Sequence, residues 1–165
     1  MPMYLRHTRS VRLDELPAHI RGKLAAHAES RQIQLGGVRA WLTHSENPPA
    51  SSGLGKLLRR RANPSDPDDE HCTVLVLHPT QILVAIDGAK RGTSALSVPL
   101  AQASVSDDSA LRALHPAISD QAGFTISGFA GEQTGSFYIG LGTEAAATEC
   151  FSAVQSAITA AKNPG

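Results

Sequence analysis

The pattern of hydrophobic and polar positions changes from a helical to a β period early in the chain. Between residues 13 and 30, apolar side chains recur every three or four positions, which predicts an amphipathic helix. The positions on its apolar face are Leu13, Leu16, Ile20, Leu24 and His27 or Ala28. Two glycines interrupt the pattern, and the stretch GGVRAWLTHSE then alternates in the way that is typical of a strand.

The rest of the chain predicts two β-hairpins. The runs HCTVLVLH (71–78) and QILVAID (81–87) are rich in β-branched residues and are joined by a short turn. The runs GFTISGF and SFYIGLG predict a second hairpin. Between the two hairpins, ALSVPLAQASV predicts one bent or broken strand, because Pro99 cannot donate a hydrogen bond to a sheet.

A second amphipathic helix is predicted from Glu144 to about Lys162, with Thr143 as its N-cap. Its apolar face is formed by Ala147, Phe151, Val154, Ile158 and Ala161, with Cys150 beside them. Strands in hairpins followed by one helix disfavour a parallel α/β fold. We therefore expect a mainly β (α+β) fold, which is a small antiparallel barrel or sandwich closed by the C-terminal helix, with an added N-terminal helix.

The stretches TVLVLHPTQILVAIDGAKRGTSALSVPLAQASV and FYIGLGTEAAATECFSAVQSAITAA resemble the bacterial pleckstrin-homology-like and GRAM-like domains. The resemblance covers about residues 38–162 and leaves residues 1–35 as an N-terminal helical segment. In that family the loop between the first two strands often binds ligands, and here this loop corresponds to residues 47–70. Some members hold phosphoinositides with a lysine near the end of the first strand. This chain offers only Arg39 in that strand, so the resemblance does not imply lipid binding.

The composition limits the class of protein further. The chain has 165 residues, of which 41% are hydrophobic and 18% are charged, as is typical of a globular protein. No apolar run approaches the roughly 18 residues that a membrane span needs, and no secretory signal is recognisable. Cys72 and Cys150 fit neither a disulfide framework nor the spacing of a metal site. These features predict a cytoplasmic protein.

The formal net charge of zero conceals two parts of opposite sign. Residues 1–62 hold 11 Lys and Arg against 4 Asp and Glu, whereas residues 63–165 hold 4 against 11. The basic part either packs on the acidic remainder of the chain or offers a surface to phosphate-rich partners. Because the whole chain is neutral, nucleic acid is the less favoured partner.

The change of sign falls inside the loop at residues 47–70, which shows no apolar periodicity. Its four basic residues are a candidate site for an anion or a partner: Lys56, Arg59, Arg60 and Arg61. Four acidic residues follow and would repel the same anionic surface: Asp66, Asp68, Asp69 and Glu70. We therefore expect a solvated, mobile loop.

Three motifs that resemble functional signatures fail on inspection. ASSGLGKLL lacks the first glycine and the Ser or Thr of a phosphate-binding loop. GLGTEA has the form of a dinucleotide fingerprint, but too little chain follows it, and we expect Gly140 and Gly142 to permit a tight turn. His71 and His78 point to opposite faces of one strand, so they cannot share a metal ion. The sequence therefore predicts no catalytic, cofactor-binding or metal-binding residue.

Together these features favour a non-catalytic module that binds a protein or peptide. Two alternatives stay open. The first is binding of an anionic lipid or phosphoinositide through Lys56 and Arg59–Arg61, and the second is a small enzyme of unrecognised type.

Overall fold

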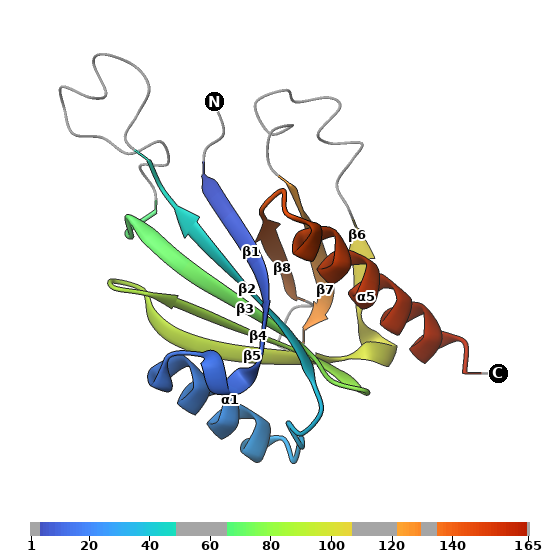
Figure 1. The fold of residues 1–165 in the computed structure, drawn as a ribbon. Helices are drawn as coiled ribbons and strands as arrows, with labels where there is room; N and C mark the ends of the chain where they lie inside the picture. The colour runs from blue at the N-terminus through green and yellow to red at the C-terminus, as the bar shows by residue number, and fades with distance from the viewer. Residues whose placement is uncertain (1–3, 49–65, 107–121, 130–134, 165) are drawn as a thin grey trace.

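The computed structural model describes residues 4–48, 66–106, 122–129 and 135–164. In this part of the chain, eight strands form two antiparallel sheets, with one helix near each end of the sequence (Figure 1). The larger sheet has the strand order β1-β2-β3-β4-β5, and the smaller sheet has the order β6-β7-β8. The mainly β class and both predicted helices are confirmed. The described strands form two separate sheets and not a closed barrel.

The elements have the following bounds. The larger sheet comprises β1 (Leu5–Val11), β2 (Arg39–Glu46), β3 (Glu70–Leu77), β4 (Gln81–Gly88) and β5 (Gly92–Pro99). The smaller sheet comprises β6 (Ser104–Ser106), β7 (Ala122–Phe129) and β8 (Gly135–Leu141). The helices are α1 (Ala18–Ser30), α5 (Ala145–Lys162) and the short 3₁₀ helices η1 (Leu13–Glu15) and η2 (Leu100–Gln102).

The larger sheet is buried on both faces, which explains why β3 and β4 are apolar at successive positions. Successive side chains of a strand point to opposite faces, so Val74 lies on the side of α1 and Leu75 on the other side. The core under α1 is formed by Val11, Leu16, Ile20, Leu24, Ala28, Ala40, Leu42, Val74, Val76, Leu83 and Ala85. The predicted apolar face of α1 is therefore confirmed.

A second core lies between the larger sheet, the smaller sheet and α5. Its buried residues are Trp41, Leu75, Ile82, Val84, Val98, Leu100, Ala103, Phe124, Ile126, Phe129, Ile139, Leu141, Ala147, Cys150, Val154 and Ile158. Phe137 and Phe151 are partly buried and pack against this core. The predicted apolar face of α5 is thus confirmed as a core-facing surface.

The chain passes from the larger sheet to the smaller sheet at Pro99. Strand β5 ends at this proline, η2 forms the corner, and β6 begins at Ser104. The backbone N–H of Leu100 donates to the carbonyl of Thr80 over 3.0 Å and fixes the corner to the β3–β4 turn. The prediction of one broken strand is confirmed, since proline cannot continue a ladder.

Two predictions near the chain ends need correction. Residues 5–11 form β1, a strand antiparallel to β2, within a segment that was expected to be helical. The N-cap of α5 is Glu144 and not Thr143. The carboxylate of Glu144 accepts a hydrogen bond from the backbone N–H of Thr8 over 3.1 Å. The side chain of Glu144 therefore ties α5 to β1 and makes no capping hydrogen bond within its own helix.

Candidate binding cleft

An open cleft of about 320 Å³ lies between the larger sheet and β8. Its lining comes from β1, β2, β3, β4, the turn after β4 and β8. The lining residues are Tyr4, Arg6, Ser45, Asp66, His71, Thr73, Ile86, Arg91, Phe137, Tyr138 and Gly140. Segments from both ends of the chain thus build one mixed polar and aromatic surface.

Arg6 is the central cation of the cleft. This half-buried residue lies on the inward face of β1, and its Nε donates a hydrogen bond to Ser45 Oγ over 3.2 Å. Its guanidinium lies 4.5 Å from the ring centre of Tyr4 and 5.9 Å from that of Tyr138, within reach of cation–π attraction. Burial lowers the pKa of Arg6 from its usual 12.5, although the two phenols oppose this, and the group stays charged at neutral pH. Among the described residues, Arg6 forms no ion pair with a carboxylate.

Two glycines leave the space that the Arg6 guanidinium and the Tyr138 hydroxyl occupy. Gly123 and Gly140 are direct partners across β7 and β8. A β-carbon on Gly140 would overlap the Arg6 guanidinium, and one on Gly123 would overlap the Tyr138 hydroxyl. The expectation that Gly140 serves a tight turn is therefore wrong: it lies within β8, has no positive φ, and instead lets a cation approach the sheet.

A network of one arginine and two aspartates, with a net charge of −1, forms one wall of the cleft. Arg91 donates from Nε to Asp68 Oδ2 over 2.8 Å and from Nη2 to Asp66 Oδ1. The Tyr4 hydroxyl donates to Asp66 Oδ2 over 2.5 Å, and the backbone N–H of Lys90 donates to Asp68 Oδ1 over 2.6 Å. Burial alone would raise the pKa of both carboxyls, but these hydrogen bonds and Arg91 outweigh it and lower both values. Arg91 is therefore satisfied within the protein, unlike Arg6.

The expected solvated character of the acidic run is wrong for Asp66 and Asp68. The side chains of these residues are only 4% and 1% exposed, because each is held by Arg91. The four predicted basic residues, Lys56, Arg59, Arg60 and Arg61, lie outside the described residues, as does the loop from 49 to 65.

His71 adds a neutral imidazole to the same cleft. Its side chain is 11% exposed, and its ring meets that of Tyr4 edge-on at 5.6 Å. Burial, and then the charge of Arg91, lower the pKa of His71 below 6.5, so the ring is uncharged at neutral pH. Nδ1 is buried, lies 3.7 Å from Asp66 Oδ2, and has no hydrogen-bond partner among the described residues.

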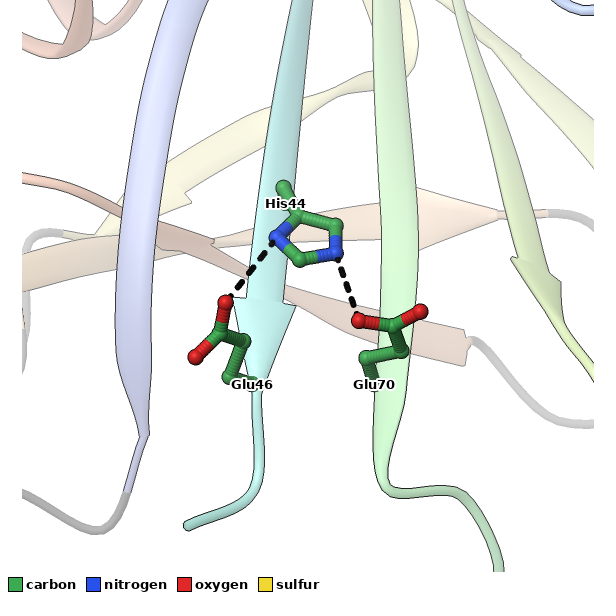
Figure 2. A group of neighbouring side chains, drawn as sticks. All are labelled: His44, Glu46 and Glu70. Atoms are coloured by element: carbon green, nitrogen blue, oxygen red, sulfur yellow. Dashed lines mark ion pairs between the residues drawn. The ribbon is translucent and has the colours of Figure 1, made fainter.

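A second cluster lies on the opposite face of the larger sheet. His44, between the inward-facing Thr43 and Ser45, points to the side of α1. Figure 2 shows its ring between the carboxylates of Glu46 and Glu70. His44 Nδ1 is 3.9 Å from Glu46 Oε1, and His44 Nε2 is 3.2 Å from Glu70 Oε2.

Two polar side-chain contacts also link the two parts of the chain that differ in net charge. Arg39 Nη2 lies 2.8 Å from Glu149 Oε1 of α5, and His19 of α1 contacts Asp87 of β4 at 2.9 Å. Both pairs fit the interpretation that the basic first part packs on the acidic remainder.

The comparisons with known proteins gave no match to a protein-family model, a curated protein or a solved structure. Over the residues that the structure describes, neither helix combines the length and the apolar character that crossing a membrane requires.

Proposed function

We propose that this chain is a non-catalytic binding module that recognises an acidic group of a protein or peptide in the Arg6 cleft. The observation that carries the proposal is Arg6 itself, a half-buried guanidinium that forms no ion pair with a carboxylate in the described part of the chain. Keeping a charge partly buried costs free energy unless an opposite charge compensates it. A partner's carboxylate can accept hydrogen bonds from the guanidinium, and the two tyrosine rings can flank the partner's side chain.

The order of elements supports a pleckstrin-homology-like form for residues 38–162. Four antiparallel strands, β2 to β5, are followed by the three strands β6 to β8 and by α5. In this interpretation the ligand-binding loop of the family corresponds to the connection between β2 and β3. Asp66, which lies in the described last part of that connection, lines the cleft. Strand β1 is the addition that brings Arg6 to this place.

A peptide partner is favoured over a lipid surface by the shape of the site. Among the described residues of the cleft, Arg6 is the cation without a carboxylate partner, and this half-buried group is flanked by aromatic rings. A membrane is bound more strongly by several exposed basic residues, each of which contributes about 1 kcal/mol. The basic residues Lys56 and Arg59–Arg61 remain the alternative, and vesicle binding distinguishes the two.

Selection from a random peptide library displayed on phage tests the proposal. We expect the protein to enrich peptides that contain Asp or Glu, and Arg6→Gln to lose this enrichment. The matched control is Arg9→Gln, an exposed residue three positions along β1 and on its other face. Enrichment of neutral or basic peptides, or equal enrichment by Arg6→Gln, would contradict the proposal. So would retention on vesicles of acidic lipids that is lost on replacing Arg59–Arg61 but not Arg6.

A further inference from the structure

The cluster on the α1 side of the larger sheet has the composition of a metal site. Glu46 and Glu70 are direct partners across β2 and β3, and His44 lies two residues before Glu46 on the same face (Figure 2). One ligand atom from each of the three side chains lies within 4.8 Å of the other two. Each side chain is partly exposed, which leaves a path for an ion to enter.

The charges of this cluster favour a cation. Two carboxylates directly opposite each other on neighbouring strands repel each other and destabilise the sheet. Each carboxylate of this pair instead turns toward a different nitrogen of His44, as Figure 2 shows. A cation held by all three groups would remove the repulsion between the two carboxylates, because both negative charges would attract it.

The distances already suit two ligands of one ion. Zinc binds imidazole nitrogen and carboxylate oxygen at about 2.0–2.2 Å, which places neighbouring ligand atoms about 3.0–3.5 Å apart. His44 Nε2 and Glu70 Oε2 are separated by 3.2 Å. Glu46 must turn to join them, and its half-exposed side chain has the room to do so.

A pocket of about 340 Å³ adjoins the cluster and supplies further donors. His44 and Glu70 form part of its wall. Cys72 lies directly opposite His44 on β3, and Asp87 lies opposite Cys72 on β4. His19 of α1 reaches the same pocket and contacts Asp87 Oδ2 through Nε2. Groups of this kind orient water molecules and other ligands that complete the coordination of an ion.

We propose that His44, Glu46 and Glu70 bind one divalent transition-metal ion of the Zn²⁺ type. The imidazole selects this class, because Mg²⁺ and Ca²⁺ prefer sites made entirely of oxygen. The site lies on the other face of the sheet from the Arg6 cleft, so this proposal is independent of the proposed function.

Calorimetric titration of the full chain with ZnCl₂ and, separately, MgCl₂ tests the proposal. We expect one Zn²⁺ per chain and at least 100-fold weaker binding of Mg²⁺. His44→Ala should weaken Zn²⁺ binding at least tenfold, and so should Glu70→Gln, which keeps the shape of the side chain. The control His78→Ala, which changes the residue that follows the far end of β3, should leave the affinity unchanged. Circular dichroism checks that each variant is folded.

Cobalt substitution gives a second measurement that does not depend on heat changes. Co²⁺ bound by nitrogen and oxygen ligands absorbs weakly in the visible range, and a cysteine ligand adds a strong near-ultraviolet band. We expect no such band, and no change in Cys72→Ser. The proposal is overturned if the chain binds no Zn²⁺ at 100-µM metal, if His44→Ala binds as tightly as the wild-type chain, or if Mg²⁺ and Zn²⁺ bind equally. The first of these results would mean that His44 only forms ion pairs with the two glutamates.

Discussion

The guanidinium of Arg6 occupies space that a β-carbon of residue 140 would overlap, so the missing side chain of Gly140 allows the cation to lie there. Gly140→Ala should push the guanidinium away from Tyr4 and Tyr138 and lower the affinity for acidic peptides at least fivefold, since a hydrogen bond to a charged group contributes about 1.5–3 kcal/mol. Fluorescence anisotropy with a labelled acidic peptide measures this change. An unchanged affinity would show that the position of Arg6 does not matter for binding.

Gly22 provides a contrasting glycine, because a β-carbon there would meet no atom within 4 Å. It is an exposed residue inside α1, where alanine is preferred over glycine. Gly22→Ala should therefore raise the free energy of unfolding by about 0.5–1 kcal/mol. Urea unfolding measures the change, and a loss of stability would mean that α1 makes a contact at this position that the structure does not include.

The core under α5 leads to a prediction about two phenylalanines, one in β7 and one in α5 itself. Phe124 is fully buried in β7, and its ring lies 5.2 Å from that of the half-buried Phe151. Phe124→Ala should cost about 3–5 kcal/mol of unfolding free energy, because a large side chain leaves a cavity. Phe151→Ala should cost less, since solvent already reaches part of its ring. Chemical denaturation of both variants checks the order, and equal or reversed losses would contradict this packing.

His71 should make stability depend on pH just below neutrality. Its pKa is lower in the folded protein than the usual 6.5, so below about pH 6.5 the unfolded chain binds a proton that the folded protein does not. Stability should therefore fall as the pH drops from 7 to 5, and His71→Gln should reduce this fall. His27, whose pKa is also lowered by burial, contributes in the same range.

The carboxyl groups of Asp66 and Asp68 affect the pH dependence of stability only at lower pH. Asp66 and Asp68 have lowered pKa values, so their contribution is present above about pH 3.8 and is lost only as the pH falls further. Urea unfolding at pH 7, 6 and 5 therefore isolates the histidines. If the unfolding free energies of the wild-type chain and of His71→Gln fall by the same amount between pH 7 and pH 5, the burial of this ring is contradicted.

The sequence predicts those strands and helices whose hydrophobic pattern lies within one continuous segment. Strands β3 and β4 are apolar runs rich in β-branched residues, and α5 carries a regular apolar stripe, so these elements were recognisable without knowledge of the fold. The sequence could also indicate a break at Pro99, because proline acts through its own backbone.

The candidate cleft could not be predicted from the spacing of its residues in the sequence, because the pairing and packing of the strands bring these residues together. Arg6 and Gly140 are far apart in the sequence and meet only because β1 and β8 face each other across the cleft. Strand β1 itself was missed, since its inward positions include the polar Arg6 and Thr8 and give no apolar alternation. The burial of Asp68 depends on Arg91, which follows only from the pairing of β3 with β4.

The most direct test of acid recognition is a nuclear magnetic resonance titration with two small probes that differ by one charge. N-acetylglutamate α-amide carries one side-chain carboxylate, and N-acetylglutamine α-amide has the same shape without a charge. We expect N-acetylglutamate α-amide to shift the Arg6 side-chain Nε–Hε resonance and the backbone amides of Ser45 and Gly140, with a Kd on the order of 1 mM, about −4 kcal/mol. The neutral probe should leave these resonances in place, and Arg6→Gln should abolish the amide shifts while Arg9→Gln keeps them. Identical responses to both probes, or amide shifts that persist in Arg6→Gln, would contradict the proposal that this cleft binds an acidic group.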